Sequence, residues 1–107
     1  MYRLGDKNMS DKFEVTFLGT NGSAAFNGGK RAKYGSNTSC VAVMAGEETL
    51  IFDSGSGICG FEELTPYHRE HLRVFFSHYH IDHISGLLFF THLFDKNKKF
   101  DLYGQCH

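Results

Sequence analysis

The sequence predicts an α/β domain with a mixed β-sheet and helices on one of its faces. Three observations support this class. Residues 13–18 alternate between apolar and polar side chains, which is typical of a half-buried strand. Residues 72–77 form a nearly continuous apolar run, as expected for a strand that is covered on both faces. From residue 82 to about residue 94, apolar side chains recur on one side of a helix.

Length and charge limit what this chain can be. At 107 residues it forms at most one domain, and that domain buries only a modest core. We expect residues 1–12 to be a flexible lead-in and residues 13–107 to be the folded part. The formal net charge of -1 gives no reason to expect nucleic-acid or membrane binding. Residues 1–12 also lack the apolar centre of a signal peptide, and no apolar run is long enough for a membrane span.

The three cysteines, Cys40, Cys59 and Cys106, are widely spaced and form no Cys-x-x-Cys pair. An odd and sparse set favours reduced thiols over a disulfide framework. We therefore expect a cytoplasmic protein without structural disulfides.

A long loop follows the first predicted strand. Its residues, 24–37, are rich in glycine and polar side chains, and loops of this length are often functional or mobile. Lys30, Arg31 and Lys33 lie in this loop. They are candidates for binding an anionic substrate, and a solvated loop explains them equally well.

The next two strands are predicted at residues 38–45 and 49–53, with a hairpin turn at residues 46–48 between them. Residues 54–57, Ser-Gly-Ser-Gly, interrupt the strand pattern. Glycines at such a place permit a close approach of the backbone to another segment.

The second half of the chain adds two short elements to the strand and helix described above. Thr65 and Pro66 suit the N-cap and the first position of a short helix. The charged residues 95–99 end the long predicted helix, with cations near its carbonyl end. Residues 100–103 are predicted to be the last strand.

The strongest chemical signal is the hexapeptide His78-Tyr79-His80-Ile81-Asp82-His83, which directly follows an apolar strand. If residues 77–80 are still extended, His78 and His80 share a face, because alternate residues of a strand do so. Asp82 and His83 then lie in the next turn and can face the same point. Two ligand pairs on one peptide predict a site for two divalent metal ions. The alternative is a solvated polar turn in a histidine-rich chain.

The other four histidines offer no second ligand set. His68 and His71 suit one helix face, but no further ligand stands near them in the sequence. His92 lies nine residues after His83 and should point away from the hexapeptide, and His107 is terminal. For all four, a surface or packing role is expected.

These residues resemble the metallo-β-lactamase-fold hydrolases, and among them the branch of ribonuclease Z and the cyclic-nucleotide phosphodiesterases. The resemblance covers nearly everything from Phe13 to Gly104, and its most specific part is the His-x-His-x-Asp-His pattern with an upstream Asp53. The other matching residues are Phe17-Leu18-Gly19-Thr20 with Gly22-Ser23, Tyr34-Gly35-Ser36-Asn37-Thr38-Ser39-Cys40, Leu50-Ile51-Phe52-Asp53-Ser54-Gly55, Ser77 directly before the hexapeptide, Ile84-Ser85-Gly86-Leu87 directly after it, and Phe100-Asp101-Leu102-Tyr103-Gly104.

The resemblance implies roles for individual residues. His78 and His80 would hold the first metal ion, and Asp82 and His83 the second. Asp53 would fix a ligand from behind by a hydrogen bond, the alternative being a turn aspartate beside Gly55. Asp82 and Asp53 are thus the expected catalytic residues. Zinc suits such a nitrogen-rich set, with manganese or iron as alternatives, and His80 disfavours the redox branch, which typically has glutamate there.

The resemblance also implies the N-terminal half of a four-layer αββα sandwich. In that fold the second half supplies further ligands: two histidines and a bridging aspartate. Packing leads to the same expectation, because apolar side chains such as those of Val74-Phe75-Phe76 would leave one sheet face bare. We expect a C-terminal half, a second copy or a different subunit to cover that face, and the 107 residues alone to be weak or inactive.

The function implied is that of a two-metal phosphodiesterase acting on a cyclic nucleotide, a cyclic phosphate or an RNA phosphodiester. Two close cations lower the pKa of a shared water, so that hydroxide exists near neutral pH. They also stabilise charge that grows on phosphoryl oxygens. Two alternatives remain open: a non-catalytic metal-binding or assembly module that needs a partner chain, and a thioester or β-lactam hydrolase of the same fold.

Overall fold

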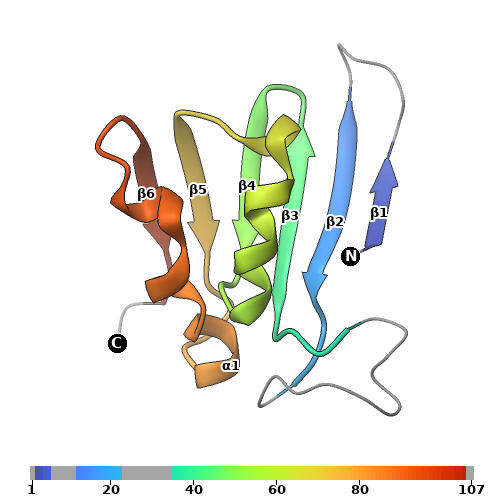
Figure 1. Cartoon of the computed structure of the whole chain (residues 1–107), viewed down its shortest axis with the longest axis vertical. Helices are drawn as coiled ribbons and strands as arrows, with labels where there is room; N and C mark the ends of the chain where they lie inside the picture. Colours follow the sequence, from blue (N-terminus) through green and yellow to red (C-terminus); the bar gives the residue numbers. More distant parts are fainter. Residues whose placement is uncertain (1, 6–11, 23–34, 106–107) are drawn as a thin grey trace.

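Six strands form a single mixed sheet in the computed structural model, which describes residues 2–5, 12–22 and 35–105. Their order in the sheet is their order in the sequence. The first four strands pair antiparallel, whereas the fifth and sixth join in parallel (Figure 1). The strands are β1 (Tyr2–Gly5), β2 (Phe13–Gly19), β3 (Cys40–Ala45), β4 (Glu48–Phe52), β5 (His71–Phe75) and β6 (Lys99–Tyr103).

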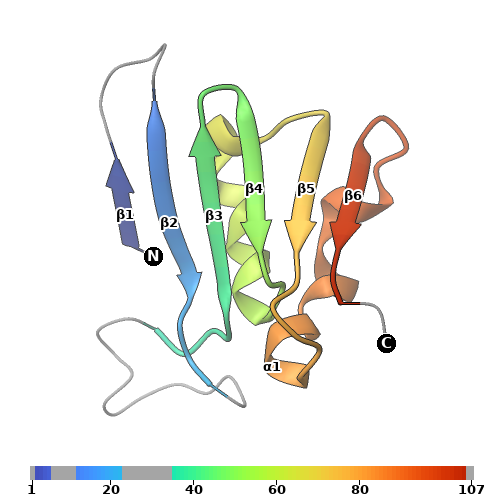
Figure 2. The same ribbon diagram turned by 180° about the vertical axis from the view of Figure 1, so that it is seen from behind.

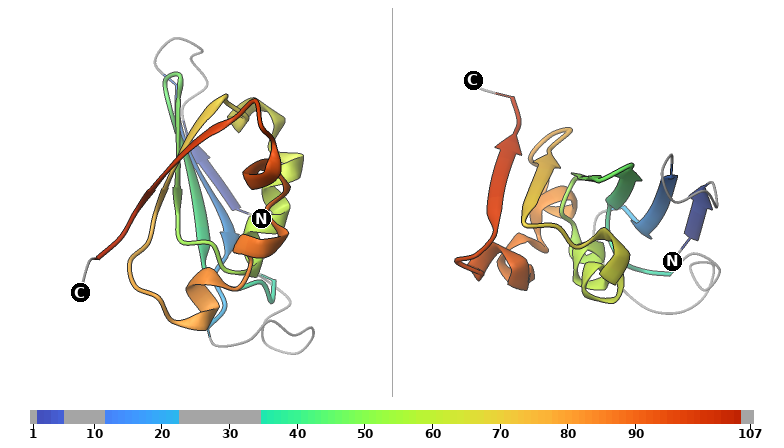
Figure 3. Two further views of the ribbon diagram at one scale, coloured as in Figure 1. Left: turned by 90° about the vertical axis from the view of Figure 1, so that its left-hand side faces the viewer. Right: turned by 90° about the horizontal axis from the view of Figure 1, so that it is seen from above.

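Short helical segments lie on one face of this sheet in the described part of the chain. Figures 1 and 2 show them in front of the sheet and behind it, and Figure 3 shows the same arrangement edge-on. The predicted α/β class, with a mixed sheet and helices on one face, is confirmed. The segments are η2 (Ser56–Glu63), η3 (Thr65–Tyr67), α1 (Ile81–Ile84), η4 (Leu87–Phe89) and η5 (Thr91–Phe94).

The single helix predicted over residues 82–94 is wrong. Only α1 is α-helical there, and the 3₁₀ segments η4 and η5 follow it. The reason is a tertiary contact: the Gly86 amide donates to the Ser54 carbonyl at 2.8 Å rather than continuing the helix. Phe90, with φ -82° and ψ 96°, is extended and separates η4 from η5.

Two elements were not predicted. Strand β1 lies within residues 1–12, where a lead-in was expected, and it pairs antiparallel with β2. The 3₁₀ helix η2 begins inside the Ser-Gly-Ser-Gly segment that was expected only to interrupt the pattern. The short helix at Thr65 and Pro66 is present as η3, but Leu64, and not Thr65, is its N-cap residue.

The core lies between the sheet and these helical segments. Ile51, Leu72 and Val74 of the sheet and Ile58 and Phe61 of η2 are completely inaccessible. Each such side chain contributes about 1.5–3 kcal/mol through removal of apolar surface from water. Packing against η2 therefore holds the sheet and its covering layer together.

The buried Tyr67 adds polar contacts to this core through its hydroxyl group. Its hydroxyl lies 2.7 Å from Thr16 Oγ1 and donates to Glu14 Oε1 at 3.2 Å. Buried tyrosines usually need such a partner. The cation of Lys12 lies 3.3 Å from the same glutamate and compensates its charge.

No described helix lies on the opposite face of the sheet, here called the open sheet face (Figure 3). The strand registers place apolar side chains on this face. Phe75 stacks on Phe52 and on Tyr103, with ring centroids 5.3 Å and 4.7 Å apart. Phe52 remains 40% exposed and Tyr103 44%. Phe75 was expected there, whereas Val74 is buried under the helices and Phe76 packs against the core. The strand registers place further members on this face: Phe13, Val15, Phe17, Val41, Val43 and Leu50.

His92 has the packing role expected of it. Its ring is buried against Phe61, Phe90 and His68, with the His68 centroid 4.4 Å away. Nε2 lies 3.3 Å from Glu62 Oε1, whereas the buried Nδ1 has no hydrogen-bond partner. Burial lowers the pKa of His92 below its ordinary value of 6.5, against the opposing effect of Glu62.

We expect the free energy of unfolding to fall as the pH drops below 6.5, the ordinary histidine pKa. The unfolded chain takes up a proton at His92 in that range before the native state does, so acid favours unfolding. Above that pH both states are neutral and the contribution of His92 is complete. Urea unfolding at a series of pH values measures this, and His92→Phe should flatten the slope. The neighbouring groups Glu62, His68 and Lys98 remain in that variant. An unchanged slope would mean that the pH dependence of the free energy of unfolding comes from them and not from His92.

No described helix is long and apolar enough to cross a membrane. Cys40 and Cys59 are free thiols, as expected, and burial raises the pKa of Cys40 well above its usual range. Cys106 lies outside the described residues.

Candidate metal centre

The hexapeptide begins where two parallel strands end. Strands β4 and β5 are paired with Phe52 opposite Phe75, so their carboxyl ends lie at the same edge of the sheet. Asp53 follows β4 directly, and its amide donates to the Phe75 carbonyl at 2.7 Å. This bond places Asp53 beside Ser77 and the residues that follow it.

Asp53 is the only described residue other than glycine with a left-handed backbone, at φ 63°. Aspartate and asparagine tolerate this conformation better than most residues, but it still costs about 1 kcal/mol. Asp53 is 7% exposed, and its carboxylate accepts from the Ser77 amide at 2.8 Å through Oδ1. Oδ2 accepts from Ser77 Oγ and from His83 Nδ1, both at 2.8 Å. Asp53 therefore accepts a hydrogen bond from the ring of His83. The resemblance implies a contact of this kind between Asp53 and a ligand.

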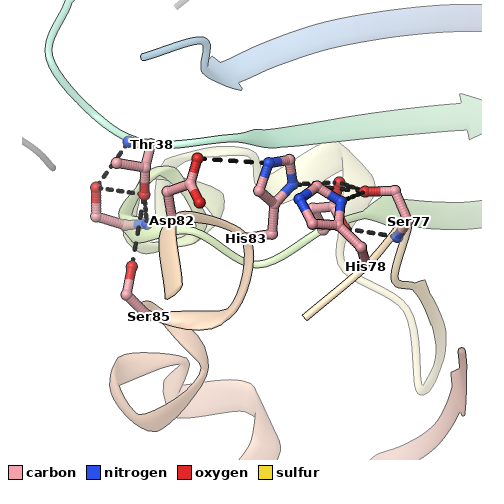
Figure 4. A network of polar contacts seen from close by, with 8 residues as sticks. Thr38, Ser77, His78, Asp82, His83 and Ser85 are labelled. Atoms are coloured by element: carbon pink, nitrogen blue, oxygen red, sulfur yellow. Dashed lines mark hydrogen bonds and ion pairs between the residues drawn. The ribbon is translucent and has the colours of Figure 1, made fainter. Parts of the chain in front are cut away.

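His83 and Asp82 have the separation expected of two ligands of one ion. Because Nδ1 of His83 is bonded to Asp53, its Nε2 is left for another partner. That nitrogen lies 3.5 Å from Asp82 Oδ2 (Figure 4). Two ligand atoms about 2.1 Å from a tetrahedral zinc ion are roughly 3.4 Å apart. The donor types and their spacing therefore fit a divalent metal ion.

The other two predicted ligands lie in the same cluster. The ring centroid of His78 is 4.5 Å from that of His80 and 4.0 Å from that of His83. His80 is extended, with φ -61° and ψ 149°, and α1 starts immediately after it. The backbone thus changes from extended to helical between His80 and Ile81, as the pattern of the hexapeptide predicted.

The described donors do not form a complete ligand set. Within the described residues, no group of three or more histidine, cysteine, aspartate or glutamate side chains is arranged to hold a metal ion. A complete zinc site usually has at least three protein ligands. The hexapeptide on its own therefore fits part of a ligand set, and further ligands would have to come from elsewhere. Lys30, Arg31 and Lys33 lie outside the described residues.

Backbone contacts dock α1 against the turn after β4. The Ser54 amide donates to the His83 carbonyl at 2.8 Å, and Gly86 returns a bond to the Ser54 carbonyl. Gly55 has no room for a side chain, since a Cβ there would lie 2.2 Å from the Asp82 carbonyl oxygen. The glycine-rich segment 54–57 thus allows the ligand peptide to approach Asp53.

Thr38 and Ser56 brace this turn from its other side. The Thr38 amide donates to Ser56 Oγ at 2.9 Å, and the Ser56 amide donates to Thr38 Oγ1 at 2.7 Å. Thr38 Oγ1 also lies 3.5 Å from Ser85 Oγ, beyond the end of α1 (Figure 4). Their part in positioning the hexapeptide was not predicted, because the sequence separates Thr38 and Ser56 by 18 residues.

Tyr79 and Ile81 alternate with the ligands along the hexapeptide. Both line an apolar pocket of about 500 Å³ together with Phe76, Ile84, Ser85, Leu87 and Leu88. The Tyr79 hydroxyl donates to the Gln105 carbonyl at 2.7 Å and ties the hexapeptide to the end of β6.

Comparison with protein-family models, with curated proteins and with solved structures gave no match. The resemblance to the metallo-β-lactamase fold therefore stands on the sequence segments given above.

Proposed function

We propose that this chain is the N-terminal half of an αββα sandwich of the metallo-β-lactamase type and belongs to a metal-dependent phosphodiesterase. The observation that carries the proposal is the alignment of Asp53, His83 and Asp82. One carboxylate accepts from Nδ1 of the imidazole at 2.8 Å, and the other lies 3.5 Å from its Nε2. A carboxylate behind a histidine ligand is common in metal sites, since it fixes the tautomer and the ring orientation.

Each residue of the centre has a role in this proposal. His78 and His80 would hold one divalent ion and Asp82 and His83 the other, with zinc favoured by the nitrogen-rich set. Bound divalent ions lower the pKa of water and stabilise charge on phosphoryl oxygens, which suits a phosphodiester substrate. Asp53, buried behind the cluster, would hold a proton on Nδ1 of His83 and orient its ring, so that Nε2 can face a metal ion. Lys30, Arg31 and Lys33 remain candidates for contacting the substrate anion.

The open sheet face supports the four-layer part of the proposal. Apolar sheet faces pack against one another about 10 Å apart in sandwiches. The stacked rings of Phe52, Phe75 and Tyr103, two of them at least 40% exposed, are suited to such a layer. We propose that a second sheet layer covers them and brings the missing ligands to the same edge, where β4 and β5 end.

The test is an assay with zinc or manganese on a cyclic nucleotide, a bis-aryl phosphodiester and a pre-tRNA. A thioester and a β-lactam serve as comparison substrates for the related hydrolases. The assay should be run on the longest natural form of the protein and, in parallel, on the 107-residue chain. We expect metal-dependent turnover of a phosphodiester by the longer form, abolished by Asp82→Asn and kept by the exposed control Asp95→Asn. Bound metal without turnover of any phosphodiester would count against this function.

A non-catalytic assembly module is the second candidate, because the described residues contain no group of three or more metal donors and no described helix covers the open sheet face. Light scattering and metal content per chain distinguish the two candidates. A monomer of the 107 residues would exclude assembly through the open sheet face. A dimer with full metal occupancy would instead place catalysis at an interface between copies.

A further inference from the structure

We infer that Ser77 is a positioning residue: it connects Asp53 to His78, so that one carboxylate sets the tautomers of two imidazoles. Ser77 lies immediately before the hexapeptide and outside the predicted ligand set. The inference deepens the proposed function, because its purpose there is to prepare His78 for a metal ion. The geometry that carries it does not depend on the reaction.

Ser77 is held from two sides. Its amide donates to Asp53 Oδ1 and its hydroxyl contacts Asp53 Oδ2, both at 2.8 Å. The same hydroxyl oxygen lies 3.0 Å from Nδ1 of His78 (Figure 4). The amide bond holds the backbone of Ser77, and the bond from Oγ to Asp53 Oδ2 holds its side-chain rotamer, so the hydroxyl oxygen is positioned for the contact with His78.

Counting protons gives the direction of each bond. An ionised carboxylate can only accept, whereas a serine hydroxyl has one proton to donate and two lone pairs. If Ser77 donated to His78 instead, its oxygen would face Asp53 Oδ2 at 2.8 Å with no proton between the two acceptors. Ser77 therefore donates to Asp53 and accepts from His78, which requires a proton on Nδ1 of His78.

His83 reaches the same state by a direct bond. Its Nδ1 is 2.8 Å from Asp53 Oδ2 but 3.5 Å from Ser77 Oγ, so the carboxylate is its partner. With Nδ1 protonated in both rings, the lone pairs of His78 and His83 lie on Nε2. A neutral ring nitrogen with a lone pair is what a metal ion requires of histidine. Asp53 thus prepares one ligand of each predicted pair.

The test is the ¹⁵N spectrum of the imidazole rings in the metal-free 107-residue chain, at about pH 8, where an ordinary histidine is neutral. We expect the wild-type protein to show the Nδ1–H tautomer for both His78 and His83. Ser77→Ala should shift His78 towards the Nε2–H tautomer, which an unconstrained imidazole favours, and should leave His83 unchanged. Ser77→Thr keeps the hydroxyl and should restore the wild-type spectrum of His78. Thr65→Ala, an exposed change in η3 outside the contacts of the hexapeptide, should alter neither ring.

An Nε2–H tautomer of His78 in the wild-type protein, or no change in Ser77→Ala, would overturn the inference. The alanine variant retains the backbone amide that donates to Asp53 Oδ1. The spectrum of its backbone amides reports whether the variant folds. Zinc titration is the second readout, with affinity expected to fall about 10- to 100-fold in Ser77→Ala. If the tautomer of His78 responds but zinc does not bind either protein, the proposed function fails while the role of Ser77 stands. If zinc binds and the tautomer does not respond, the role of Ser77 fails alone.

Discussion

Replacing His78 and His80 together with alanine is expected to remove one of two bound metal ions and to leave the fold intact. The two rings are in contact with each other, with centroids 4.5 Å apart, and neither belongs to the buried core. Loss of a residue that merely supports a ligand costs about 10- to 100-fold in metal affinity, so loss of two ligands should cost at least that at the first site. The proposed second site would keep Asp82 and His83, and His83 would keep its bond to Asp53.

Zinc titration followed by calorimetry measures both the affinity and the number of ions per chain. His71→Ala is the matched control, since His71 lies 2.7 Å from Asp101 on the sheet and away from the hexapeptide. We expect wild-type binding in that control and the loss of one ion in the double variant. Equal stoichiometry in the double variant and the wild type would show that His78 and His80 hold no metal.

A methyl group at position 55 is expected to lower the free energy of unfolding by about 3 kcal/mol, at the upper end for an overpacked site. A Cβ on Gly55 would lie 2.2 Å from the Asp82 carbonyl oxygen and 2.7 Å from the Thr38 carbonyl carbon. Both are backbone atoms, and they belong to two different segments of the chain. Neither can rotate away as a flexible side chain would, so α1 must move away from the turn after β4.

Gly55→Ala should therefore weaken zinc binding as well as stability, because Asp82 moves with α1. Urea unfolding and zinc titration of the same variant measure the two effects. Gly22→Ala is the control, since a Cβ at Gly22 meets nothing within 4 Å. If Gly55→Ala proved as stable as Gly22→Ala, the close docking of α1 on residues 54–57 would be wrong.

The sequence predicted the strands well where a long-range partner did not change them. Strands β2, β3, β4, β5 and β6 lie within one or two residues of their predicted ranges. Strand β2 alternates as a strand with one buried face should, with Glu14, Thr16 and Leu18 buried. Strand β5 was expected to be covered on both faces, but in the described residues only its Leu72 and Val74 are buried. Strand β1 is only four residues long, Tyr-Arg-Leu-Gly, too short for any alternation to stand out from a polar segment.

The helical layer was harder to predict because distant contacts decide it. Gly86 bonds to Ser54, 32 positions earlier in the sequence, and this ends α1 after four residues. In η2, the buried Ile58 and Phe61 are three residues apart, as one turn of a 3₁₀ helix requires, but the preceding Ser-Gly-Ser-Gly suggested only a turn.

In the candidate centre, the local spacing of residues was sufficient to predict that the histidines of the hexapeptide lie close together. His78, His80 and His83 come together because one short peptide changes from extended backbone to helix between His80 and Ile81. Ser77 was noted only as a residue that matches the family, and its positioning role was not predicted, since that role depends on Asp53, 24 residues away in the sequence. Only the pairing of β4 with β5 brings these two residues together.

Metal content is the most direct test of the proposed centre. The protein, metal-free and then exposed to zinc and to manganese, should be crystallised, with anomalous scattering recorded at the absorption edge of each metal. We expect anomalous peaks beside Nε2 of His78 and of His83, with Asp82 contacting the second. Rings without any such peak, in crystals of folded protein soaked in excess metal, would contradict the metal centre.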